Sequence, residues 1–370
     1  KAAQLNQEAV DNGLVRENGA FKIIKGEQGI EVNVEDSIAA IENYISSEWD
    51  GGNAEIELVA EVVEPRGSEE DLEQITDMMG SYTTNYKDSG QNRCDNISNA
   101  TSKINGTLLY PGEEFSVYEA IGPLDAANGY ELAGAYENGQ TVESYGGGVC
   151  QVSTTLYNAV ILAELEITQR SNHSMIVSYV KPSMDAAIAG DYKDLRFVNN
   201  QDIPIYIEGY TEGKNVIFKI YGHDTRPSNR VVTYESEVVS EQDPGTQYVA
   251  TGDPAGYMKT AQGKHIGYVA RLWKVVTVDG VEESREIFNK STYKASPKIV
   301  NVGTASADPN VSAVIGAALA TGDEATINAA VAPYAASAAA ILNPAPVEQP
   351  SQEEQAITGT VDESQITGGE

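Results

Sequence analysis

The segment Tyr145–Tyr157, with the sequence YGGGVCQVSTTLY, constrains the fold more than any other stretch of the chain. Its three successive glycines precede a run in which apolar residues recur at helical spacing as far as Ala163. The chain is therefore predicted to turn sharply at the glycines and to enter a helix at or near Cys150. Unpaired N–H groups and the positive end of the helix dipole favour an anion at such a place. For a cysteine that anion is its own thiolate, which is the nucleophilic form.

His173 is the best candidate for the base that a nucleophilic cysteine requires. It follows the predicted helix by a few residues, and an antiparallel return strand over 175–180 would bring it back towards Cys150. His223 and His265 lie in other segments and are less suitable. The glycines would also let a substrate backbone approach closely and would expose N–H groups to an oxyanion. The residues expected to provide this contact are Gly147, Gly148 and Gln151.

Other interpretations of the same segment stay open at this point. A cysteine at the start of a buried helix is commonly inert packing. An exported chain with two cysteines often pairs them, which would join Cys94 to Cys150. The glycines could cradle a phosphate, but the Lys-Ser or Lys-Thr pair of a phosphate-binding loop does not follow them. A single histidine is more often structural, so it is the pairing of His173 with the cysteine that predicts chemistry.

Changes in composition divide the chain into four stretches. The boundaries expected are a small α+β module over 1–75, a central domain over 76–229, a β-rich extended module over 230–304 and an acidic, largely disordered tail over 305–370. The first module is predicted to contain a helix with Ile38, Ile41 and Ile45 on one face, followed by a strand over 55–63. The fold class predicted is therefore α+β, with antiparallel strands predominating and the helix that begins near Cys150 packed against a sheet.

The charge balance excludes several classes of function. The chain has 55 Asp and Glu against 24 Lys and Arg, a net charge of -31, which is unsuited to nucleic-acid phosphates or to an anionic membrane surface. Two cysteines and three separated histidines offer no cluster for a metal, so neither a metal nor another cofactor is expected. No stretch approaches the roughly 18 apolar residues of a membrane span. A membrane anchor is therefore expected only in a segment preceding Lys1.

Over about 92–221 the chain resembles the VanW family of bacterial cell-envelope proteins. The block over 146–159, GGGVCQVSTTLYNA, carries the resemblance most specifically. The other matching residues are Arg93, Asn96-Ile97, Ala100, Ile104-Asn105-Gly106, Tyr110-Pro111-Gly112-Glu113, Phe115-Ser116, Gly129-Tyr130, Ala133, Arg170, His173-Ser174, Tyr179-Val180, Asp185-Ala186, Asp194-Leu195 and Phe197. More loosely, the first module resembles the peptidoglycan-binding module often found ahead of VanW domains, and 231–304 resembles the five-glycine extracellular module often found after them.

The resemblance implies work on the wall of a bacterium, outside the cell and most simply in a Gram-positive organism. VanW relatives are linked to glycopeptide antibiotic resistance, and some act as L,D-transpeptidases of peptidoglycan. By this resemblance Cys150 would attack the carbonyl that joins diaminopimelate to the terminal D-Ala of a donor stem peptide, while His173 moves the protons. Arg170, Ser174 and Asp185 would orient the histidine or bind substrate, although a helix or turn cap is the commoner role of a lone Asp.

The partners expected on this basis are peptidoglycan stem peptides and glycan, with no nucleic acid. Two competing hypotheses remain beside the transpeptidase. The first is a non-catalytic cell-wall-binding or surface protein, whose modules only hold it on the glycan. The second is a cysteine peptidase or L,D-carboxypeptidase of the wall, which would use the same site with water as the acceptor.

Overall fold

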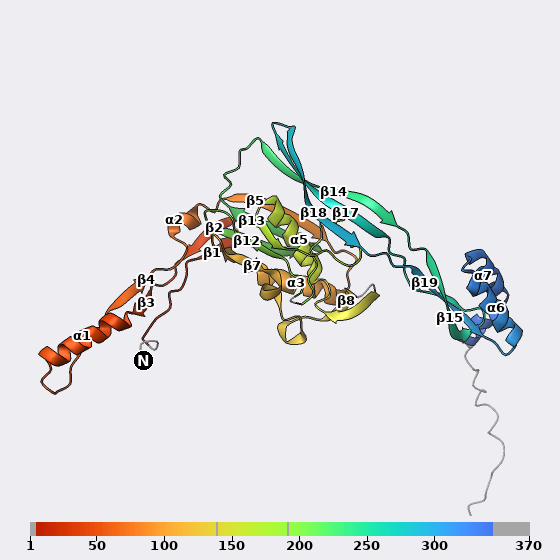
Figure 1. The fold of residues 1–370 in the computed structure, drawn as a ribbon, viewed down its shortest axis with the longest axis horizontal. Coiled ribbons are helices and arrows are strands. Elements are labelled where there is room, and N and C mark those ends of the chain that lie inside the picture. Colours follow the sequence, from red (N-terminus) through yellow and green to blue (C-terminus); the bar gives the residue numbers. More distant parts are fainter. Residues whose placement is uncertain (1–4, 138–139, 191, 343–370) are drawn as a thin grey trace, which may run out of the picture. The chain divides into compact units, whose positions relative to one another are not determined.

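The computed structural model describes residues 5–137, 140–190 and 192–342 (Figure 1). Two compact units make up the chain. The first comprises Lys1–Gly245 and Lys264–Pro297, and the second comprises Thr246–Gly263 and Lys298–Glu370. Helices and mostly antiparallel strands occur together, so the prediction of a strand-rich α+β protein is confirmed.

The first strands of the chain form two small antiparallel ladders. Strand β1 (Gly13–Glu17) pairs with β2 (Ala20–Ile24), and β3 (Gly29–Val32) pairs with β4 (Ala60–Val63). Both residues of the β1–β2 turn, Asn18 and Gly19, have positive φ angles, as a two-residue hairpin turn requires. The observed β4 is shorter than the strand predicted over 55–63.

Helix α1 (Val34–Ser47) begins at Asn33, whose side chain accepts a hydrogen bond from the backbone N–H of Asp36. The apolar face predicted for this helix is not covered within the described residues, since Ile38 is 50% exposed and Ile45 is 52% exposed. A short second helix, α2 (Glu69–Glu73), instead places Leu72 in a buried cluster that includes Tyr206 and Tyr221 of the central domain. The module over 1–75 is thus attached to the central domain through its hairpin and α2 and not through α1.

Two antiparallel sheets and a hairpin form the central domain. The larger sheet has the order β5-β13-β12-β6 and the smaller one the order β10-β11-β7, while β8 pairs with β9. Their bounds are β5 (Asp77–Asn85), β6 (Thr107–Leu109), β7 (Glu114–Ser116), β8 (Leu132–Glu137), β9 (Gln140–Tyr145), β10 (Glu166–Gln169), β11 (Arg196–Val198), β12 (Ile205–Glu212) and β13 (Asn215–Gly222). The helical elements of this domain are α3 (Gln91–Ile104), α4 (Val117–Ile121), the 3₁₀ turn Ala126–Asn128 and α5 (Val149–Leu162).

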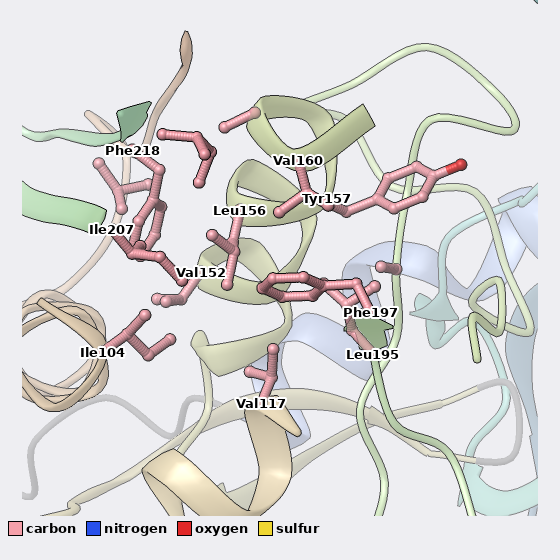
Figure 2. Close-up of a cluster of buried hydrophobic side chains, with 14 of the residues drawn as sticks. Ile104, Val117, Val152, Leu156, Tyr157, Val160, Leu195, Phe197, Ile207 and Phe218 are labelled. Carbon is pink, nitrogen blue, oxygen red and sulfur yellow. The ribbon is translucent and has the colours of Figure 1, made fainter. Parts of the chain in front are cut away.

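Helix α5 lies in the middle of this domain and is buried on all sides, since 12 of its 14 residues are buried. Its close approach to β5 depends on Gly80, because a Cβ there would lie 2.2 Å from the carbonyl oxygen of Ala159. Figure 2 shows apolar side chains of α5 between two groups of core residues, with Ile104, Ile207 and Phe218 on one side and Leu195 and Phe197 on the other. The core therefore fixes the position of the helix that begins beside Cys150.

A third antiparallel sheet packs on the same domain and has the order β14-β17-β18. Its strands are β14 (Arg230–Gln242), β17 (Gly267–Val278) and β18 (Val281–Tyr293). Leu272 of β17 belongs to the central core, and the hydroxyl of Tyr234 donates to the carbonyl of Ile161 in α5 at 2.9 Å. The β-rich stretch predicted over 230–304 thus contributes strands to both units, and this part of it is continuous with the central domain.

Glu164, just after α5, ties this sheet to the central domain. Its carboxylate pairs with Arg230 of β14, with Lys274 of β17 at 2.7 Å and with Arg226 at 3.6 Å. Burial raises the pKa of Glu164, but the hydrogen bonds from Arg230 and Lys274 outweigh it and bring the pKa down to about 2. The ionised form is therefore favoured by folding.

Glu164→Gln is expected to lower the free energy of unfolding at pH 7 by about 1–3 kcal/mol, because it removes the anion that these cations surround. Since the folded pKa lies below the ordinary value, this contribution is present above about pH 4.3 and is lost as the pH falls towards 2. Urea unfolding of the two proteins from pH 2 to 7 measures it. Glu212→Gln, which removes an exposed carboxylate without an ion pair among the described residues, is the control. A loss that stays constant over this pH range would contradict the prediction.

The second unit contains a three-stranded sheet and the last helices of the described chain. Strand β19 (Lys298–Ala305) pairs in parallel with β15 (Thr246–Pro254) and antiparallel with β16 (Met258–Gln262). The helical elements that follow are α6 (Pro309–Thr321), α7 (Glu324–Val331), the 3₁₀ turn Ala332–Tyr334 and α8 (Ala335–Leu342). Ile315, Ile327 and Val331 from these helices are buried with Val300 and Val302 of β19.

Within the stretch predicted to be a largely disordered tail, the Ala-rich part over 309–342, whose residues 311–319 and 325–342 have a composition that allows short helices, is helical in the structure. These residues form helices because alanine, the best helix former, is their commonest residue, and α6 and α7 bury apolar side chains against the sheet of the second unit. The rest of the predicted tail, 343–370, lies outside the described residues. Contrary to the expectation from the sequence, the run over 324–342 has the length and composition of a membrane-spanning helix, and 17% of its apolar window is buried in the structure. Length and composition alone do not distinguish a membrane span from other apolar helices.

Candidate active site

The glycine triplet turns the chain into α5 and places Cys150 in the first turn of that helix. Gly146 and Gly148 have φ angles of 75° and 117°, a region that side chains other than glycine rarely adopt. Gly147 lies against the preceding hairpin, where an added Cβ would be 2.5 Å from the carbonyl oxygen of Ala133. All three glycines are therefore required by the backbone itself.

Cys150 is a free cysteine, as is Cys94, so the Cys94–Cys150 disulfide is not present. The backbone of Ile188 brackets the sulfur: its carbonyl oxygen lies 3.4 Å from Sγ and its nitrogen lies 3.5 Å from Sγ. The thiol can donate to this carbonyl, and the thiolate can accept from this N–H. The sulfur of Cys94 instead donates to the carbonyl of Ser89 at 3.6 Å.

His173 is held against Asp185 and also contacts Cys150. Its Nδ1 lies 2.7 Å from Oδ2 of Asp185, and its backbone N–H donates to the same oxygen at 2.7 Å. This places a proton on Nδ1 and leaves Nε2 available to interact with Cys150, an interaction that raises the pKa of His173. Asp185 is thus not the turn cap that a lone Asp suggests. Its carboxylate is fully buried and orients the imidazole.

The three side chains shift each other's pKa values towards a thiolate, an imidazolium and a carboxylate. Burial raises the pKa of Cys150, but its hydrogen bond with His173 and the charge of that ring outweigh burial and lower it. Burial lowers the pKa of His173, but its hydrogen bonds with Asp185 and Cys150 raise it to about 9. Burial raises the pKa of Asp185, and the hydrogen bond and charge of His173 reverse this and lower it. The shifts of Cys150 and His173 are therefore in the directions that favour an ion pair of the two side chains.

The oxyanion contact predicted from Gly147, Gly148 and Gln151 requires a correction. The N–H of Gly147 donates to Ser144 at 3.3 Å and that of Gln151 donates to Gly148 at 2.9 Å, because the tight turn closes on itself. The side-chain amide of Gln151 points away from the sulfur and bonds Thr84 and Asn85 at 3.0 Å. In the described part of the chain, the N–H groups of Gly148 and Cys150 are the ones near this turn without an acceptor.

Cys150 and His173 line a groove with a volume of about 2150 Å³, which the β8–β9 hairpin and the segment 85–93 also border. Its basic lining residues are Lys87, Arg93, Lys193 and Lys294, and its acidic ones are Asp88 and Glu143. Among the described residues, these four cations make no ion pair with a carboxylate, whereas twelve other Lys and Arg side chains do. In a chain with a net charge of -31, the groove is a local exception that suits an anionic ligand.

The other predicted residues lie beside the pair but do not contact the sulfur. Arg170 donates to Asp185 through Nη2 at 3.0 Å to the carboxylate and through Nε at 2.7 Å to the backbone carbonyl. Ser174 lines the groove, and its carbonyl accepts from the N–H of Lys294 at 2.7 Å. The sequence gives no signal for Ile188, which contacts the sulfur through its backbone, because any residue could provide those groups.

Comparisons with known proteins agree with this domain order. The family described as VanW like protein matches residues 92–221, and the G5 domain matches residues 229–305. An uncharacterized protein of Bacillus subtilis, YoaR, is 32% identical over 214 residues, which cover 58% of this chain and 69% of that one. The vancomycin B-type resistance protein VanW of Enterococcus faecalis is 28% identical over 143 residues, covering 37% of this chain and 51% of its own.

A solved IgA1 protease G5 domain is also similar, with 26% identity and a TM-score of 0.16, over 21% of this chain and 94% of that one. The combination of a VanW-like domain with a G5 domain is that of a bacterial cell-envelope protein, extracellular or associated with the wall. The chain belongs to the VanW family. The predicted family and the predicted five-glycine module are thus confirmed, and the peptidoglycan-binding character of 1–75 stays a prediction.

Proposed function

We propose that this protein is an L,D-transpeptidase-like acyltransferase that cross-links peptidoglycan stem peptides with Cys150 as its nucleophile. The observation that carries the proposal is that Cys150 and His173 line one large groove, with the imidazole held against Asp185 and the interaction of the two side chains lowering the pKa of the thiol. A cysteine paired with an oriented histidine is the arrangement that acyl transfer through a thioester requires. Inert packing would not need a buried ion pair beside the sulfur, since burying charges is costly.

In the first half-reaction, the Cys150 thiolate attacks the carbonyl carbon that joins diaminopimelate to the terminal D-Ala. The N–H groups of Gly148 and Cys150 stabilise the tetrahedral oxyanion. The imidazolium of His173 gives its Nε2 proton to the leaving nitrogen, so D-Ala departs as a neutral amine and a thioester remains. Asp185 holds the ring while it changes charge.

In the second half-reaction, the side-chain amine of an acceptor stem peptide attacks the thioester. Neutral His173 takes the proton from the attacking nitrogen, and the Cys150 thiolate leaves as the new amide forms. The enzyme returns to its thiolate and imidazolium state. With water in place of the amine, the same steps release a shortened peptide and make the site an L,D-carboxypeptidase.

The decisive experiment incubates the full chain with diaminopimelate-containing tetrapeptide muropeptides and identifies products by mass spectrometry. Cross-linked dimers that disappear with Cys150→Ala support the proposal, with Cys94→Ser as the matched control that removes the other free thiol. If the products are instead monomers shortened by D-Ala, the protein is an L,D-carboxypeptidase and not a transpeptidase. If the muropeptides bind but stay unchanged, the non-catalytic wall-binding hypothesis replaces it.

The unpaired groove cations predict how substrate binds. The double substitution Lys193→Gln/Lys294→Gln is expected to raise KM about 30-fold or more for muropeptides with free carboxylates, because each of the two charged hydrogen bonds is worth about 1 kcal/mol or more. It should change KM little for muropeptides whose carboxylates are amidated. Steady-state kinetics at two salt concentrations measure both. Lys259→Gln/Lys290→Gln, two exposed cations outside the groove, is the control. An equal change for both substrates would show that these lysines do not recognise carboxylates.

A further inference from the structure

The last strand of the third sheet ends beside the catalytic segment. Tyr293, the final residue of β18, is 2% exposed, and its hydroxyl donates to Oδ1 of Asp185. The same hydroxyl oxygen accepts from the backbone N–H of Ser183 at 2.7 Å. Burial, followed by the charge of Asp185, raises the pKa of Tyr293, so the hydroxyl keeps its proton at neutral pH and acts as a donor to the carboxylate.

The contacts of the strand extend over four consecutive residues. Ser291 Oγ accepts from Arg170 Nη1 at 2.9 Å, and the carbonyl of Thr292 accepts from the side chain of Asn172 at 2.9 Å. Tyr293 follows with its contact to Asp185, and the N–H of Lys294 donates to the carbonyl of Ser174 at 2.7 Å. These four residues therefore fix the chain on both sides of His173 as well as the carboxylate that orients it.

We propose that Tyr293 is a positioning residue for the Cys150–His173 pair and that strand β18 of the G5 domain is part of the catalytic apparatus. This inference rests on the proposed function. It assigns the G5 domain a role beyond that of a separate wall-associated module. The family match to the VanW-like domain ends at residue 221, so that domain alone lacks the group that completes the site.

The physical reason lies in how the carboxylate of Asp185 is held. Oδ2 accepts two bonds from His173, while Oδ1 accepts from Arg170 and Tyr293. Two hydrogen bonds thus hold each oxygen, and Tyr293 supplies one of the two at Oδ1. Without the Tyr293 hydroxyl, the anion is less stabilised and less firmly oriented. His173 then holds its second proton less tightly, and the Cys150 thiolate loses the charge that stabilises it.

The test replaces Tyr293 by phenylalanine in a full chain that carries Cys94→Ser, and follows alkylation of Cys150 by iodoacetamide as a function of pH. Tyr293→Phe is expected to move the midpoint of this profile to higher pH and to slow turnover of muropeptides about tenfold or more, as is usual for partners that orient a reactive group. Tyr234→Phe is the matched control. It removes a partly buried tyrosine hydroxyl of the same sheet, bonded to Ile161, without touching the site.

Loss of stability and loss of positioning are separated by the two variants. If Tyr293→Phe and Tyr234→Phe lower the unfolding midpoint similarly but only Tyr293→Phe moves the alkylation profile, the inference holds. If Tyr293→Phe does not fold, Ser291→Ala is expected to move the profile in the same direction by a smaller amount, since it releases Arg170. An unshifted profile in a folded variant would overturn the inference. Because alkylation needs no turnover, this result is independent of whether the muropeptides are cross-linked.

Discussion

His173→Ala is expected to abolish measurable turnover, with a loss of about 10³-fold or more, because the site loses both its proton carrier and the charge that stabilises the thiolate. Without His173, burial remains as the main influence on Cys150 and raises the pKa of its thiol above the ordinary range. Iodoacetamide should then modify Cys150 only slowly at pH 7. The measurement is made with Cys94→Ser present, so that Cys150 is the one thiol in the chain.

The pH dependence of turnover by the unsubstituted protein tests the ion pair of Cys150 and His173. The thiolate of Cys150 is present below its usual titration range, because its pKa is lowered by His173. The imidazolium is lost above about pH 9, because the pKa of His173 is raised to that value. Turnover should therefore fall on the basic side near pH 9. A basic limb near pH 6.5, or a Cys150 alkylation rate that His173→Ala does not change, would refute the ion pair.

Asp185→Asn is expected to have the second largest effect, with turnover reduced about 10²- to 10⁴-fold because the ring loses its oriented anion. The free energy of unfolding should fall by about 3–5 kcal/mol, since the substitution leaves buried Arg170 without its charged partner. The pKa of Asp185 is lowered in the folded state, so its stabilising contribution is present above its ordinary value near 3.8 and is lost as the pH falls through the folded value. The free energy of unfolding of Asp185→Asn should therefore decrease less than that of the unsubstituted protein as the pH falls below 3.8.

Asp194→Asn separates the two effects. Asp194 is equally buried in the same domain and accepts bonds from the Ser116 side chain and the Tyr118 backbone, but it does not contact the Cys150–His173 pair. The Asp194→Asn variant should have a lower free energy of unfolding, while the pH midpoint of Cys150 alkylation stays unchanged. Should both variants move that profile alike, the effect of Asp185 would be one of general stability and the proposed orienting role would be wrong. Guanidinium unfolding and alkylation on the same samples provide both readouts.

The elements of the first module show where sequence patterns are insufficient. The helical spacing of Ile38, Ile41 and Ile45 predicts a helix, and α1 is there, but the same spacing predicts a buried face that the described residues do not cover. Periodicity describes one element and does not say what packs on it. The last helices show the same limit. The Ala-rich composition of 309–342 allows helices but does not predict that Ile315, Ile327 and Val331 are buried against a sheet.

Some features of the candidate site can likewise be predicted from the sequence, and others depend on the tertiary structure. The sequence by itself determines the turn at Gly146–Gly148 and the helix that starts beside Cys150, because both follow from local backbone preferences and spacing. It also singles out His173, which is near in sequence. Only the tertiary structure decides that Asp185 accepts from Tyr293, a residue 108 positions away, and that the N–H of Gln151 is already used by the turn. Such contacts depend on how separate sheets pack around one core, and no short-range pattern of residues records that packing.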